Sequence, residues 1–199
     1  AKSWLDQIGQ AGRRMGDLIE GILTLSRSTR GELRHDAVDL SALARRRLEE
    51  RARDEPGRRV AVVVEDGLMV RGDARMLEAA LGNLIDNAWK YSAKAGTPTI
   101  RIRAEVREGR RWFCVEDNGA GFDMAHAARL FQPFQRLHRQ DEFPGIGIGL
   151  ATVARIVHRH GGEIEARGTV GQGATFCFTL AASQEGYAPP QRPHAHDGD

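Results

Sequence analysis

Between Val60 and Ala182 the apolar residues change their spacing several times, and the order of these changes limits the fold more than any other feature of the sequence. Runs such as TIRIRAEV, WFCVED, EIEARG and ATFCFTL alternate as strands do, whereas the segment from Asp73 to Ala93 repeats with helical spacing. A short strand pair, a long helix, a hairpin, a helix and a final hairpin predict an α+β sandwich with helices on one face of a mixed sheet.

Turn and capping residues set the expected boundaries of these elements. RVAVVVED and LMVRGD are read as two strands joined by the turn at Asp66-Gly67, and Asp73 is expected to cap the long helix. EGRR and TVGQG are hairpin turns, a short helix is expected around Met124 to Phe131, and another helix ends at His160.

The first part of the chain has a different, strictly helical pattern. Its apolar or small residues alternate spacings of four and three, which predicts the seam of a helical bundle. These residues are Trp4, Ile8, Ala11, Met15, Leu18, Ile22 and Leu25. A second helix is expected from an N-cap at Asp39 or Ser41 to about Asp54. We expect a chain that starts within a helix, with a helical segment over 1–36, one domain over 37–182 and a disordered tail over 183–199.

Composition excludes several classes of function. The 29 Lys and Arg residues nearly balance 27 Asp and Glu residues, and RRRLEERARDEPGRR reads as a solvated helix face, so no nucleic-acid surface is expected. No apolar run has the length of a membrane span and no signal-peptide pattern is present, which predicts a soluble chain without membrane contact. Cys114 and Cys177 lie in apolar runs and are expected to be buried free thiols in a reducing compartment.

Three glycines stand at alternate positions in FPGIGIGLATVARIVHRHGG, directly before a helix. Gly145, Gly147 and Gly149 do not have the dinucleotide-binding spacing, so a Rossmann motif is disfavoured, and the Walker motif fails because no Gly-Lys-Ser/Thr follows them. A glycine turn that leads into the start of a helix near Leu150 nevertheless offers backbone N–H groups and a positive helix end, which suit a phosphate.

Three further motifs carry polar side chains at the ends of elements. In NLIDNAWKYS, helical spacing places Asn83, Asn87, Lys90 and Tyr91 on one face. DNGAGF follows a buried strand and brings a carboxylate beside two glycines, and GQGATF follows the last turn. Taken singly, the first is ordinary polar surface and the other two are ordinary turns.

In this order, the motifs resemble the ATP-binding domain of sensor histidine kinases. NLIDNAWKYS is similar to the family's asparagine box, LFQPFQRLH to its phenylalanine box, and DNGAGF, GIGIGLAT and GQGATF to its glycine boxes. The resemblance covers Val38 to Ala182 and implies the Bergerat (GHKL) ATPase sandwich. RMGDLIEGILTLSRSTRGELRHDAVDLSAL resembles the second helix of the dimerisation and phosphotransfer hairpin, and the lid run is most similar to kinases with PAS or phytochrome sensors.

The resemblance also implies a role for each matching residue. Asn87 would bind Mg²⁺ with Asn83 beside it, while Lys90 and Tyr91 would contact the phosphates or ribose of ATP. The adenine would be bound by the residues Asp117, Gly119, Gly121 and Thr175. The phosphates would be reached from a flexible lid and the helix behind it by Arg136, His138, Gly145, Gly147, Gly149 and Leu150.

The implied activity is transfer of the ATP γ-phosphoryl group to a histidine, for relay to the receiver domain of a response regulator. Related hydrolytic ATPases place a glutamate where this chain has Asn83, and a neutral amide is no general base, so hydrolysis is disfavoured. A serine kinase and a nucleotide-binding pseudokinase stay open as alternatives. None of the seven histidines lies in the family's His-Glu/Asp-x-x-x-Pro acceptor motif, so the acceptor helix is expected upstream.

Partners and location follow from the same resemblance. The N-terminal helix would form a homodimer, and the full protein would carry an upstream sensor domain. The kinase domain would be cytoplasmic, and the full protein could have a membrane anchor upstream. His158 and His160 end a helix, where cations suit the dipole, and are expected to be structural. His194 and His196 are assigned to the disordered tail.

Overall fold

The computed structural model describes residues 32–137, 142–143 and 145–181. The predicted bundle seam, the tail after residue 182 and His138 lie outside these residues. Within them the elements follow one another as β1 (Asp36–Asp39), α2 (Leu40–Asp54), β2 (Ala61–Val64), β3 (Met69–Gly72), α3 (Ala74–Tyr91), η1 (Ser92–Lys94), β4 (Thr99–Arg107), β5 (Arg110–Asp117), η2 (Met124–Arg129), α4 (Gly149–Arg159), β6 (Ile164–Thr169) and β7 (Gly173–Phe178).

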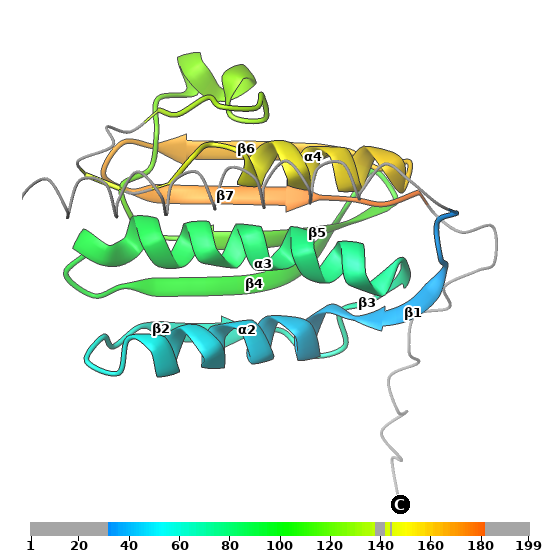
Figure 1. Cartoon of the computed structure of the whole chain (residues 1–199), viewed down its shortest axis with the longest axis horizontal. Helices are drawn as coiled ribbons and strands as arrows, with labels where there is room; N and C mark the ends of the chain where they lie inside the picture. Colours follow the sequence, from blue (N-terminus) through cyan, green and yellow to red (C-terminus); the bar gives the residue numbers. More distant parts are fainter. Residues whose placement is uncertain (1–31, 138–141, 144, 182–199) are drawn as a thin grey trace, which may run out of the picture.

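The predicted α+β sandwich with a mixed sheet is confirmed. Five strands lie in the order β2-β4-β5-β7-β6, in which only β2 and β4 are parallel. Helices α2, α3 and α4 lie side by side against one face of this sheet (Figure 1). The core between the two layers is built from Leu84 and Ile85 of α3, Val157 of α4, and Val115 and Phe178 of the sheet.

Both long helices near the site begin at the aspartates that the sequence indicated. The Asp39 carboxylate accepts from the Ala42 N–H at 3.0 Å and caps α2. The Asp73 carboxylate accepts from two N–H groups of the first turn of α3, each at 3.2 Å. These caps satisfy amides that a helix start otherwise leaves unpaired, so the local sequence fixes where each helix begins.

The expected strand pair at Asp66-Gly67 is wrong. β2 pairs parallel with β4, whereas β3 pairs with β1, a strand that the sequence reading did not expect. The Ser41 hydroxyl donates to the Glu65 carbonyl at 2.8 Å and accepts from the Leu68 N–H at 3.0 Å. The start of α2 therefore binds both sides of the turn, and the chain leaves the main sheet there instead of folding back on it.

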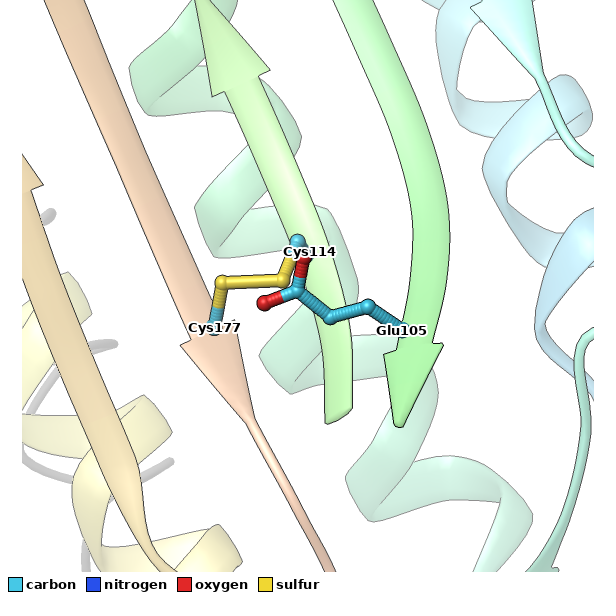
Figure 2. A group of neighbouring side chains, drawn as sticks. All are labelled: Glu105, Cys114 and Cys177. Carbon is cyan, nitrogen blue, oxygen red and sulfur yellow. A yellow bond between two sulfur atoms is a disulfide. The ribbon is translucent and has the colours of Figure 1, made fainter. Parts of the chain in front are cut away.

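The expectation of two free thiols is also wrong. Cys114 and Cys177 occupy directly opposite positions on the antiparallel strands β5 and β7 and form a disulfide (Figure 2). Both are buried, as predicted, but on the sheet face away from the helices, in a small cluster with Trp112. The two cysteines are 63 residues apart in sequence, so their pairing could not be predicted without the strand order that places β5 beside β7.

His160 is structural, as expected, but not as a cation. Its Nε2 accepts from the backbone N–H of Asp73 at 3.0 Å, and its Nδ1 lies 2.7 Å from the Ile156 carbonyl. One ring nitrogen must accept and the other donate, which is the neutral tautomer. Burial accordingly lowers the pKa of His160.

Among the described residues, no helix is long and apolar enough to cross a membrane.

Candidate functional site

A cavity of about 970 Å³ lies along the polar face of α3. Asn83, Asn87, Lys90 and Tyr91 all line it, as their helical spacing predicted. The opposite face of α3 is buried against the sheet, and this leaves the four polar side chains half-buried at the boundary between protein and cavity. The sequence pattern of α3 thus determines which of its faces becomes the site.

The start of α4 forms the wall opposite α3. The Asn83 amide donates to the Ala79 carbonyl at 2.8 Å, which holds its oxygen towards Gly149. A Cβ on Gly149 would lie 2.6 Å from that oxygen, so a larger residue there would have to displace the Asn83 side chain. Gly149 and Leu150 both line the cavity, so the start of α4 borders the same space as the polar side chains of α3.

Lys90 and Arg136 give the cavity its positive charge. Burial, together with the positive charge of the neighbouring Arg136, lowers the pKa of Lys90 to about 8. The Lys90 ammonium lies 4.3 Å from the centre of the Tyr91 ring. Two cations that share a partly dehydrated space destabilise each other, and an anion placed between them relieves this repulsion.

The glycine-rich segment lies over this cavity. The Arg136 guanidinium donates to the Gly145 carbonyl at 2.6 Å and also to the Phe143 carbonyl. The Phe143 ring is buried against Tyr91, with 4.9 Å between ring centres. Gly147 has a φ of +81°, and a Cβ there would lie 2.6 Å from the Gln135 carbonyl oxygen. The segment is therefore packed closely onto residues of the predicted phosphate site.

Asp117 and Thr175 line a second, smaller cavity of about 420 Å³. The Asp117 side chain, at the end of β5, is 9% exposed and accepts from the Gly119 N–H at 2.8 Å. Burial raises its pKa from 3.8 to about 6. Ala174 lines both cavities, so the carboxylate lies beside the first cavity without opening into it. The predicted site residues are thus divided between two adjoining spaces.

Gly119 and Gly121 lie so close to neighbouring backbone that a side chain would not fit at either position. A Cβ on Gly119 would lie 2.3 Å from the Tyr91 carbonyl oxygen, and one on Gly121 would lie 1.9 Å from that of Thr169. Gly121 also has a φ of +59° and lines the larger cavity, whereas Gly119 lines neither cavity. Both glycines allow the loop after β5 to lie directly against the ends of α3 and β6.

The sequence reading missed the wall formed by α2. Its arginines were expected to be a solvated face, yet Arg46, Arg47 and Arg51 line the larger cavity. The Arg47 guanidinium donates to both oxygens of Asp86, at 3.0 and 2.5 Å. Asp86 is the residue directly before Asn87. The four-residue spacing of Arg47 and Arg51 was a signal for one helix face, but only packing shows that this face meets α3.

Comparisons with known proteins agree with this geometry. Residues 72–184 match the family model described as Histidine kinase-, DNA gyrase B-, and HSP90-like ATPase. Cyanobacterial phytochrome A of Nostoc is 35% identical over 172 residues, which are 81% of this chain and 22% of that protein. The histidine-protein kinase/phosphatase MprB of Mycobacterium ulcerans is 35% identical over 180 residues, which are 87% of this chain and 34% of that protein.

Solved structures give the same result. Full-length ShkA in complex with AMPPNP superposes with a TM-score of 0.69 at 28% identity, over 90% of this chain and 38% of that one. The chain spans between about a fifth and a third of the curated relatives named above. The chain therefore belongs to the histidine kinase-, DNA gyrase B- and HSP90-like ATPase family, in which it represents the catalytic ATPase domain of the sensor histidine kinase type.

Proposed function

We propose that this domain binds Mg²⁺-ATP and transfers its γ-phosphoryl group to a histidine on a separate helix of the full kinase. The observation that carries the proposal is the larger cavity, where Asn83, Asn87 and Lys90 of α3 face Arg136 and the N-terminus of α4. Two cations and a helix start are a suitable environment for a triphosphate. Catalysis of this kind depends mainly on positioning and on neutralising charge.

Mg²⁺ would be held by Asn87. Its side chain lines the cavity half-buried, between Asn83 and Lys90 along the same helix face. One amide oxygen, completed by phosphate oxygens and water, is a donor set that Mg²⁺ accepts. When bound, the ion neutralises charge on the phosphates, and Lys90 and Arg136 add to this effect from the protein.

The adenine would lie near the smaller cavity. The Asp117 carboxylate would accept from its exocyclic amine, and the Thr175 hydroxyl would bind beside it. Since Ala174 separates this space from the larger cavity, a nucleotide that spans both would pass along β7 and Gly121. His138 is assigned to the phosphates on the family resemblance alone.

Transfer is preferred to hydrolysis because of how the carboxylates around the larger cavity are paired. Among the described residues its lining contains Glu50, Glu78 and Asp86. Each of the three accepts from an arginine of α2, at distances between 2.5 and 3.0 Å. An ion-paired carboxylate is a weak general base, because its partner stabilises the unprotonated form. Asn83 occupies the position at which hydrolytic relatives have their glutamate.

The remaining assignments concern the whole protein. A homodimer would form through residues 1–36, an upstream sensor would control the kinase, and a response regulator receiver domain would accept the phosphoryl group. The cytoplasm would be its location, because ATP and receiver domains are found there. These assignments are supported by the relatives, one of which is named a signal transduction histidine-protein kinase/phosphatase.

The experiment is phosphorylation with labelled ATP, in the presence and absence of a polypeptide that carries the acceptor helix. We expect an acid-labile, base-stable phosphate on that helix and none on this chain alone, since its histidines lack the acceptor motif. Asn87→Ala should remove labelling, whereas Glu163→Gln, at an exposed carboxylate that pairs with Arg110 at 2.6 Å outside both cavities, should keep it. Label on this chain alone, or label that survives N87A, contradicts the proposal. Nucleotide binding without transfer would support the pseudokinase instead.

A further inference from the structure

A cluster of potential metal ligands lies on the sheet face opposite the helices, away from both cavities. Cys114 and Cys177 face each other across β5 and β7, and Glu105 of β4 reaches over them (Figure 2). The two sulfur atoms and a Glu105 carboxylate oxygen all lie within 4.8 Å of one another. In the oxidised protein both sulfurs are used by the disulfide. Reduction would leave two thiols and a carboxylate converging on one point.

The helix-side core does not depend on this disulfide. Along β5 the side chains alternate, so that Phe113 and Val115 belong to the main core, while Cys114 lies in a separate buried cluster with Cys177 and Trp112. Opening the bond would therefore leave the contacts between sheet and helices in place. The reduced protein is expected to keep the fold described above.

Charge balance around the cluster favours a cation in the reduced state. Within the part of the chain that the structure describes, three arginines and three glutamates form one connected network of ion pairs beside the sulfurs, and their formal charges cancel. Its members are Arg103, Arg107, Arg167, Glu105, Glu116 and Glu165. Two thiolates would add two negative charges beneath this network. A divalent ion would restore the balance that the disulfide has.

The neighbouring arginines also prepare the ligands. The Arg107 guanidinium lies 3.5 Å from the Cys177 sulfur, which places a hydrogen-bond donor beside this ligand. Arg103 and Arg107 both contact the Glu105 carboxylate and hold it in place above the two sulfurs. Ligating carboxylates are commonly oriented by such outer hydrogen bonds.

We propose that Cys114, Cys177 and Glu105 form a redox-gated site for Zn²⁺ or a similarly thiophilic divalent ion. A small dithiol reduces the disulfide, becomes a disulfide itself and leaves two protein thiols. The ion then displaces two protons and binds both sulfurs and the carboxylate, with water as a fourth ligand. Two thiolates with a carboxylate suit zinc, whose bonds to sulfur are about 2.3 Å long. The disulfide and the bound ion exclude each other, and neither depends on the proposed kinase activity.

The experiment is a cobalt titration of the whole chain after reduction by a phosphine and anaerobic removal of the reductant. His194 and His196 are replaced by alanine throughout, so that imidazole binding in that segment does not contribute. We expect one Co²⁺ per chain with a thiolate-to-cobalt charge-transfer band, which Zn²⁺ removes stoichiometrically. The oxidised protein should show no band. Zn²⁺ should also slow the return of the disulfide on exposure to oxidised glutathione.

Three variants test the individual ligands. C177S should lose the band, and E105Q should weaken binding by at least about tenfold, the size of effect seen for residues that support a metal site. E163Q is the matched control, because Glu163 pairs with Arg110 at 2.6 Å outside the cluster, and it should bind as the parent does. If C177S does not fold, the cobalt titration of the reduced parent protein alone tests the site. Absence of the band from reduced, folded parent protein overturns the site, and equal affinity of E105Q and parent overturns the three-ligand assignment.

Discussion

Replacing Asp117 by asparagine should make the stability of this domain less dependent on pH and should weaken nucleotide binding. Asp117 is 9% exposed, and burial raises its pKa from 3.8 to about 6. The folded state therefore holds the proton more tightly than the unfolded state does. The stability that this group contributes is complete below pH 3.8 and is lost as the pH rises through about 6. At about 1.4 kcal/mol per pH unit, the whole difference is about 3 kcal/mol.

The accessible part of this difference can be measured between pH 5 and pH 7.5. Over that range the linkage relation gives about 1.4 kcal/mol, with the wild type losing stability relative to D117N as the pH rises. The assay is urea unfolding of both proteins at a series of pH values. D123N, which alters an exposed carboxylate that accepts from the Ala125 N–H at 2.9 Å, controls for the loss of one charge. If the unfolding free energies of wild type and D117N change in parallel with pH, the buried Asp117 carboxylate does not have the raised pKa, which refutes the prediction.

The same variant tests the assignment of the adenine site. Loss of a charge-assisted hydrogen bond to the buried Asp117 carboxylate should reduce nucleotide affinity by about 1.5–3 kcal/mol at pH 7, or roughly 10- to 150-fold. Calorimetry with a non-hydrolysable ATP analogue measures this directly. The wild-type affinity should fall as the pH drops below about 6, because protonation removes the accepting carboxylate. An unchanged affinity would mean that the base binds elsewhere.

Further predictions concern backbone and packing. Gly121→Ala, at a φ of +59° and with a Cβ 1.9 Å from a carbonyl oxygen, should destabilise the fold by more than about 3 kcal/mol in urea unfolding, whereas Gly109→Ala, at +74° with nothing within 4 Å, should cost only about 1–2 kcal/mol. Gly149→Ala should weaken nucleotide binding in calorimetry by displacing Asn83, and the further loss should be smaller in an N83A background. His160→Ala should cost about 1–3 kcal/mol in unfolding free energy by leaving a buried N–H unpaired, and a loss under 0.5 kcal/mol would contradict that role.

Much of the fold could be predicted from the sequence because its determinants are local. Asp39 and Asp73 cap the helices that follow them, and each cap needs only residues two or three positions ahead. The hairpins β4–β5 and β6–β7 join neighbouring strands through short turns that the sequence shows. The polar face of α3 follows from helical spacing alone. These features depend on the chain within about ten residues of each position.

The sequence was less informative wherever two distant segments meet. β1 was missed because four residues with one buried side chain give no alternation that exceeds chance, and the residues of its partner β3 that pair with it are at least 30 positions away in sequence. The neutral state of His160 depends on the N–H of Asp73, which is 87 residues distant. The part of α2 that lines the cavity was expected to be solvent-exposed because arginines usually face water. The sequence gives no sign that the Arg47 guanidinium pairs with Asp86 of α3.

Except for β1, the sequence by itself therefore determined the element types, together with the helix starts, the family motifs and the polar face on which the candidate nucleotide site is built, because periodicity and capping act over short distances. Only the tertiary structure decided that Cys114 meets Cys177, that β2 and β3 belong to different sheets, and that Asp117 and Lys90 line separate cavities. The physical reason is that strand order and helix packing set these contacts, and both depend on the free energy of the whole folded core and not on any one segment.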